Sequence, residues 1–193
     1  VTPKYRAFLK QFPTARSLAN ATLADALRAW QGLGYNRRGK YLHKAAKMIE
    51  DHFRGRFPQT AEDIEKLPGV GRYTARAVAA FAYNSPEVFI ETNIRTVYLH
   101  HFFKNKTSVP DNIILPYIEE TLDTKNPREW YWALMDYGAF LKKQHGNMNR
   151  RSAHYAKQSK FEGSNRQIRG LIIKTVLTEG HITASALAKR IKR

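Results

Sequence analysis

The chain has 193 residues, 42% of them hydrophobic, which is ample for a buried core and argues against bulk disorder. Its net charge of +17 indicates a polyanionic partner. No apolar run approaches the ~20 residues that span a bilayer, and no secretory signal opens the chain. We expect a cytoplasmic protein with no membrane partner, built as one large domain or two small ones.

Cysteine is absent from the chain. Disulfides and thiolate-ligated zinc or iron–sulfur sites are therefore excluded. His145 and His154 are two lone histidines in a polar stretch, and they do not form a plausible metal site by themselves. We expect no metal and no organic cofactor.

Helix-start signals in the first third of the chain predict helices. Thr22 opens a helix that contains Trp30, and Thr60 opens another in which Ile64 and Leu67 face inward. Between them lies an amphipathic helix, 41–53, whose apolar face is formed by Leu42, Ala45, Ala46 and Ile49.

Residues 67–71 read LPGVG and predict a sharp turn between the helix from Thr60 and a new helix over 72–82. Such a turn leaves backbone amides uncovered at a helix N-terminus, where the orphan donors and the helix dipole favour an anion. By itself P-G-x-G is as often a simple helix–helix turn. With the basic charge of this chain, a DNA phosphate is the expected anion.

The rest of the chain is also predicted to be helical, so the fold class is all-α. Val88-Phe89-Ile90 is too short for a strand and is interpreted as a buried connector. Two helices follow, and their expected apolar faces are Ile114, Ile118 and Leu122 in 111–122, and Trp130, Ala133, Leu134 and Tyr137 in the helix that Asn126-Pro127 opens.

The last quarter of the chain, 142–193, holds 13 lysines and arginines against two acids, which is +11 of the total charge. We interpret 142–165 as a basic linker that contacts DNA; a merely solvated basic face is the alternative. Helices at 166–177 and 182–191 predict a partial helix-turn-helix or winged-helix segment, cut off at Arg193.

Three motifs resemble the helix-hairpin-helix superfamily of DNA base-excision glycosylases, which includes endonuclease III, MutY and the thymine-mismatch glycosylases. A carboxylate, Glu91, follows the hairpin by about twenty residues. The segment 30–38 resembles the W-x-G-L-G-Y-Y segment of MutY, and 134–139 resembles the L-M-D-x-G-A helix of MutY and endonuclease III. The match covers roughly 1–141, which we assign as the glycosylase domain.

The resemblance implies a role for each matching residue. Tyr35 matches a tyrosine that wedges into the base stack beside the lesion, although it could simply be half-buried in a glycine-rich turn. The residues expected to contact DNA are Gln31, Gly34, Tyr35, Arg37, Arg38, Leu67, Gly69, Val70, Gly71, Arg72, Thr74 and Asn93.

Tyr73 and Glu91 are the expected catalytic residues. Endonuclease III has a lysine at the position of Tyr73, so a tyrosine implies base removal without strand cleavage; MutY usually has serine and the thymine-mismatch enzymes have tyrosine. Glu91 takes the place of the family's aspartate, which stabilises positive charge on the deoxyribose and helps to activate water. It departs from the family by one methylene, and a loop glutamate with no role is the alternative.

The chain also departs from the family at two other places. The four-cysteine iron–sulfur loop of most endonuclease III and MutY proteins is replaced by a basic, polar segment. Val1 matches a point just after the MutY helix that carries the adenine-protonating glutamate, so the sequence resembles a fragment without its first helix.

We predict a monofunctional glycosylase of the MutY-like branch that removes adenine opposite 8-oxoguanine or guanine. Its expected substrate is double-stranded DNA, bound as a monomer in the nucleoid, and the hairpin carbonyls can hold a monovalent cation. A thymine or uracil mismatch glycosylase, favoured by Tyr73, is the first alternative. A non-catalytic helix-hairpin-helix DNA-binding protein is the second.

Overall fold

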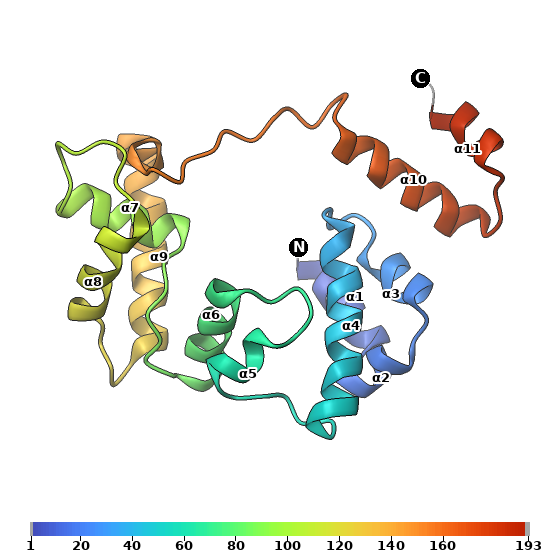
Figure 1. Cartoon of the computed structure of the whole chain (residues 1–193), viewed down its shortest axis with the longest axis horizontal. Coiled ribbons are helices and arrows are strands. Elements are labelled where there is room, and N and C mark those ends of the chain that lie inside the picture. Colours follow the sequence, from blue (N-terminus) through green and yellow to red (C-terminus); the bar gives the residue numbers. More distant parts are fainter. Residues whose placement is uncertain (1, 192–193) are drawn as a thin grey trace. The chain divides into compact units, whose positions relative to one another are not determined.

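The computed structural model describes residues 2–191, and these residues form helices joined by loops, with a long extended segment between η1 and α10 (Figure 1). Within that range no strand forms, and the one isolated β-bridge pairs Val109 with Ser152. The predicted all-α class is confirmed. None of the helices in the described range is both long and apolar enough to cross a bilayer.

The chain folds into two compact units. The first comprises 1–58, 67–69 and 158–193, and the second comprises 59–66 and 70–157. These units follow packing, so the predicted domain 1–141 contributes to both of them. The predicted boundaries at 141/142 and 165/166 stay predictions about domains.

The first unit contains six helices of the described range, with a small core of Phe12, Leu18 and Ala46 among others. Its α3 and α4 pack closely, because a Cβ on Gly39 would lie only 2.7 Å from Cγ of Trp30. The helices are α1 (Thr2–Gln11), α2 (Ala15–Asn20), α3 (Leu23–Trp30), α4 (Asn36–Phe53), α10 (Asn165–Glu179) and α11 (Ala184–Ile191).

The second unit has its main core around α7, which lies beside α9 (Figure 1). Ile94, Leu99, Ile114 and Tyr131 are fully buried there. A second small cluster joins α5 to α6. The helices are α5 (Ala61–Glu65), α6 (Arg72–Tyr83), α7 (Thr92–His101), α8 (Asp111–Thr121), α9 (Pro127–His145) and the short 3-10 helix η1 (Met148–Arg151).

The predicted helices all form, and their starts follow local hydrogen bonding. The side chains of Thr22 and Thr60 accept from the amides of Asp25 and Asp63 and cap α3 and α5. α9 begins after Asn126 as predicted, but the side chain of Asn126 makes no such bond; Pro127 suits the first helical position instead.

Two predicted apolar faces are partly wrong. In α4, Leu42 is exposed, whereas Ala45, Ala46 and Ile49 are buried as predicted. In α9, Ala133 and Tyr137 are exposed, and the buried face is Tyr131, Leu134, Gly138 and Leu141. Periodicity could not find this face because its central residue is a glycine, which a hydrophobic pattern does not count.

Three short elements, α1, α2 and η1, were not predicted from the sequence. α2 has a capping box between Thr14 and Ser17, but serine at its third position is not the usual glutamate or glutamine. η1 is capped by Asn147, whose side chain accepts from the amide of Asn149.

Candidate nucleic-acid interface and active site

The hairpin between α5 and α6 depends on one glycine. Gly69 has a φ of +81°, and a Cβ there would lie 2.5 Å from Cβ and Cγ of Tyr41. Only glycine tolerates both the left-handed backbone and this close approach. Gly71 differs, because its φ is −108° and open space surrounds the position of a Cβ.

The hairpin leads into the exposed start of α6. Gly71 is the N-cap, and Arg72 and Thr74 are exposed on the first turn. In the described part of the chain, the amides of Gly69, Val70 and Gly71 form no hydrogen bond. Free amides at the positive end of a 12-residue helix form a surface that favours a phosphate.

Tyr41 joins two of the predicted DNA-contacting residues. Besides packing against Gly69, its hydroxyl accepts from Nε and Nη2 of Arg37 at 3.0 and 2.7 Å. These bonds hold the pKa of the Tyr41 hydroxyl below its usual range. Sequence reasoning missed Tyr41; its place four residues after Arg37, on the same helical face, was the available signal.

Tyr35 has a left-handed backbone conformation, which is unusual for a bulky residue. Its φ is +48°, and its side chain is 59% exposed at the start of α4. A bulky residue in the left-handed region is strained, and such strain persists where surrounding contacts enforce it. Here Trp30 Nε1 donates to the carbonyl of Gly34 at 3.0 Å and fixes the preceding turn.

The exposure of Tyr35 excludes the half-buried alternative for its side chain. Its hydroxyl accepts from Nε2 of Gln158 at 2.6 Å. Arg38 is exposed, with its guanidinium over the ring of Trp30, and Gln31 is half-buried as the C-cap of α3.

Glu91 and Tyr73 are brought together in the second unit. Glu91 is the N-cap of α7, and its carboxylate accepts from the amide of Asn93 at 2.6 Å. Tyr73 lies on the first turn of α6, with its ring edge-on to Phe89 at 5.9 Å between centroids. Burial first, and then the charge of Glu91, raise the pKa of the Tyr73 hydroxyl. The Tyr73 hydroxyl therefore lies within electrostatic reach of Glu91 and stays protonated more readily than a free phenol.

Within the predicted linker, the short helix η1 packs on α7, whereas residues 153–160 are exposed. Arg151 donates to the carbonyls of Leu99 and Phe103, each at 2.9 Å, and also to that of Lys104. Asn149 is 4% exposed and donates to α7 as well. Polar side chains therefore hold η1 in place.

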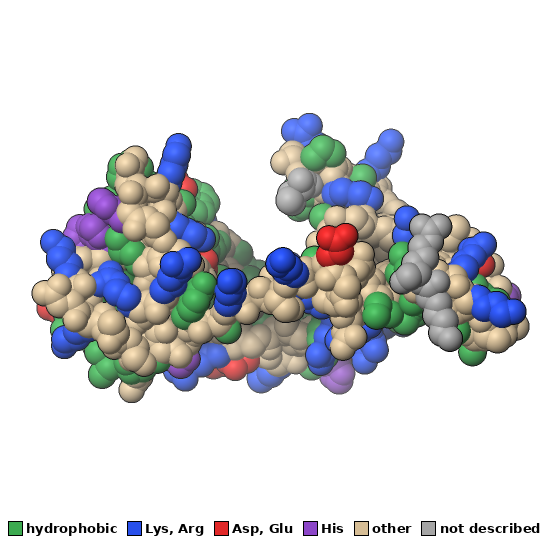
Figure 2. Space-filling view, turned by 90° about the horizontal axis from the view of Figure 1, so that it is seen from above, with side chains coloured by type: hydrophobic (Ala, Val, Ile, Leu, Met, Phe, Trp, Pro, Cys, Tyr) green, Lys and Arg blue, Asp and Glu red, His purple; other side chains and the backbone are tan. Residues whose placement is uncertain are grey.

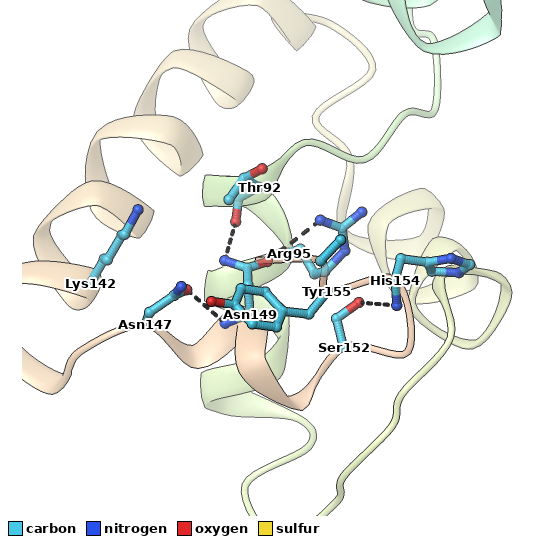
Figure 3. A pocket seen from close by; sticks show the side chains of 9 residues that line it. Thr92, Arg95, Lys142, Asn147, Asn149, Ser152, His154 and Tyr155 are labelled. Atoms are coloured by element: carbon cyan, nitrogen blue, oxygen red, sulfur yellow. Dashed lines mark hydrogen bonds between the residues drawn. The ribbon is translucent and has the colours of Figure 1, made fainter. Parts of the chain in front are cut away.

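Figure 3 shows the pocket of about 210 Å³ that the predicted linker forms with the start of α7. Thr92 and Arg95 of α7 and Lys142 of α9 line one part of it, and Asn149 and Tyr155 line another. The guanidinium of Arg95 donates two hydrogen bonds of 2.7 Å to the carboxylate of Asp111. The pocket is polar, and its lining contains no carboxylate.

The predicted site residues fall into two groups. Gln31, Gly34, Tyr35, Arg37, Arg38, Leu67 and Gly69 belong to the first unit, and Leu67 is buried. Val70, Gly71, Arg72, Tyr73, Thr74, Glu91 and Asn93 belong to the second.

A family model for the helix-hairpin-helix motif matches residues 52–81. An adenine DNA glycosylase of Buchnera aphidicola subsp. Baizongia pistaciae is 32% identical over 142 residues, which are 73% of this chain and 40% of that protein. One of Mycolicibacterium smegmatis is 43% identical over 97 residues, or 50% of this chain and 33% of that protein.

Solved structures agree on the fold. A thermostable thymine-DNA glycosylase superposes with a TM-score of 0.63 at 21% identity, covering 79% of this chain and 75% of that one. An endonuclease III in a non-covalent DNA complex gives 0.59 at 17% identity, covering 86% and 72%. The chain therefore shares the fold of these two proteins, and the helix-hairpin-helix motif that the family model matches lies within it.

The sequence relatives are named adenine DNA glycosylases, which supports the MutY-like resemblance that the segment 30–38 predicted. This chain spans less than half the length of the two relatives described above.

Proposed function

We propose that this protein removes adenine mispaired with 8-oxoguanine or guanine in duplex DNA by hydrolysing the N-glycosidic bond. The observation that carries the proposal is the similarity in sequence of this chain to adenine DNA glycosylases. Glu91 and Tyr73 lie at the starts of two helices, and the charge of Glu91 acts on the Tyr73 hydroxyl.

In the proposed reaction Glu91 stabilises the cationic deoxyribose that develops as the bond breaks, and it helps to activate water. Its carboxylate is already oriented by the amide of Asn93. Tyr73 has no amine and cannot form a Schiff base, so the product is an intact strand with an abasic site. No cofactor takes part in these steps.

Duplex DNA is the proposed partner of a monomer that acts at the nucleoid. The free amides of the hairpin bind a backbone phosphate, and Arg37 and Arg38 add positive charge in the other unit. Tyr35, exposed and strained, fills the gap that the flipped base leaves.

A thymine or uracil mismatch glycosylase is the second candidate. Tyr73 favours it, because the thymine-mismatch enzymes carry tyrosine at this position. The leaving groups differ, since adenine departs easily once protonated, whereas thymine departs as an anion held by hydrogen bonds.

Single-turnover assays of the full-length protein on A:8-oxoguanine and T:G duplexes test both candidates. We expect faster excision from A:8-oxoguanine, with strands that break only after alkali or heat. Glu91→Gln should abolish turnover while DNA binding persists, because it keeps size and removes the charge. Faster excision from T:G would favour the second candidate. If Glu91→Gln kept its rate within about twofold, Glu91 would have no catalytic role. A wild-type protein that binds DNA but excises no base would be a DNA-binding module without catalysis.

A further inference from the structure

Glu91 is the N-cap of α7, and Asn93 lies in its first turn. Two residues from later in the chain contact this turn: Gly138 by close packing and Asn149 by a hydrogen bond. We propose that Gly138 of α9 and Asn149 of η1 are positioning residues that set the place of the Glu91 carboxylate. The inference rests on the proposed catalytic role of Glu91.

Gly138 allows α9 to touch the backbone of α7. A Cβ at this position would lie 2.1 Å from the carbonyl oxygen of Asn93, 2.6 Å from its carbonyl carbon and 2.9 Å from its Cα. These are backbone atoms, so they cannot rotate away as a flexible side chain could. Any larger residue at 138 must push the first turn of α7 off α9.

That displacement reaches the carboxylate directly. The amide of Asn93 is the donor to Glu91, at 2.6 Å, and Glu91 is the N-cap residue of the same turn. Moving the Asn93 peptide therefore moves or breaks the hydrogen bond that orients the carboxylate.

Asn149 fixes the same turn through hydrogen bonds. Its Nδ2 donates to the carbonyl of Thr92 at 3.0 Å and to Oγ1 of Thr96 at 2.8 Å (Figure 3 shows the first bond). Thr96 Oγ1 in turn donates to the carbonyl of Thr92 at 2.9 Å. The side chain of Asn149 is 4% exposed, so water cannot replace these bonds easily. The peptide that follows Glu91 and Thr92 is thus held by a closed set of buried bonds.

Misplacing a reacting group by ~1 Å can lower a rate on the order of a hundredfold. Gly138→Ala introduces the overlap with Asn93. Asn149→Asp keeps the size of the side chain but replaces its amide donor with an oxygen facing the Thr92 carbonyl. We expect each variant to lower the single-turnover rate by at least about tenfold, with the Kd for DNA changed by less than about threefold.

Matched controls separate position from general damage. Gly170→Ala changes a glycine inside α10 that has open space around it, and Asn105→Ala changes an exposed asparagine. Both should keep the wild-type rate. A folding defect would instead lower the fraction of active molecules, which titration of active sites with excess DNA measures, and would leave the rate of the remaining molecules unchanged.

The backbone amide of Asn93 supplies a readout that needs no activity. In the wild type, its NMR shift should report the hydrogen bond that couples it to the Glu91 carboxylate. We expect this coupling to weaken in Gly138→Ala and Asn149→Asp and to persist in both controls.

Unchanged rates, or an unchanged Asn93 amide in both variants, would overturn the positioning role. A wild-type protein that excises no base would refute the proposed function only, and the amide measurement would still decide whether Gly138 and Asn149 position Glu91. If Gly138→Ala does not fold, Asn149→Asp decides, since it introduces no extra atom.

Discussion

At the scale of single residues, the capping role of Glu91 and its proposed catalytic role depend on the same geometry. Its carboxylate caps α7 through the amide of Asn93, and this is a structural role that a capping residue commonly has. The same bond leaves the carboxylate oriented beside Tyr73. A structural role for Glu91 is therefore compatible with the catalytic one, and the substitution of aspartate by glutamate keeps the cap.

The pKa of Tyr73 provides a prediction about this pair. Burial and the negative charge of Glu91 both disfavour the phenolate and raise the pKa of the hydroxyl. Glu91→Gln removes only the second cause, so the pKa of Tyr73 should fall but stay above its usual value. An ultraviolet or NMR titration of tyrosine measures it. Tyr131, whose pKa burial raises without a contribution from Glu91, is the internal control. No change at Tyr73 would mean that the two side chains are not neighbours in solution.

At the scale of elements, the hairpin between α5 and α6 contains two glycines with different requirements. Gly69 needs its left-handed backbone and its missing Cβ, because Tyr41 fills the space beside it. Gly71 needs neither, since its backbone is extended and nothing surrounds its Cβ position.

These two glycines form a matched pair for mutation. Gly69→Ala should destabilise the protein by about 1–3 kcal/mol, as expected for an enforced left-handed backbone, and should weaken DNA binding by displacing the hairpin. Gly71→Ala should be within about 1 kcal/mol of the wild type in stability. Urea unfolding and DNA titration measure both quantities. Equal effects of the two substitutions would contradict the contact between Gly69 and Tyr41.

At the scale of the whole molecule, the net charge of +17 is the dominant property. Figure 2 shows lysine and arginine side chains spread over the face that it presents, with few acidic ones among them. Because each neutralised phosphate releases condensed counterions, affinity for DNA should fall steeply with salt.

We expect the Kd for duplex DNA to rise at least about tenfold when salt increases from about 50 to 200 mM. Fluorescence anisotropy with a labelled duplex at several salt concentrations measures the slope. The same titration with Arg37→Gln should show a shallower slope, because one phosphate contact is removed. An affinity that is independent of salt would exclude a backbone-phosphate interface.

The sequence by itself determined the all-α class, most helix starts and the LPGVG hairpin. These features depend on residues close together in the chain: a threonine that caps its own helix, a proline at a first turn, a glycine at a left-handed turn. The resemblance to the family also selected Tyr73 and Glu91, which are eighteen positions apart and which the fold brings together.

Only the tertiary structure decided which faces are buried and what holds the site. Leu42 and Tyr137 have apolar spacing but are exposed, because burial depends on which distant elements pack against a helix. Tyr41 became a partner of the hairpin through Gly69, and η1, which has no periodic pattern, was ordered by Asn149 and Arg151 on α7. Such contacts join residues far apart in sequence, and neither spacing nor composition records which distant surfaces meet.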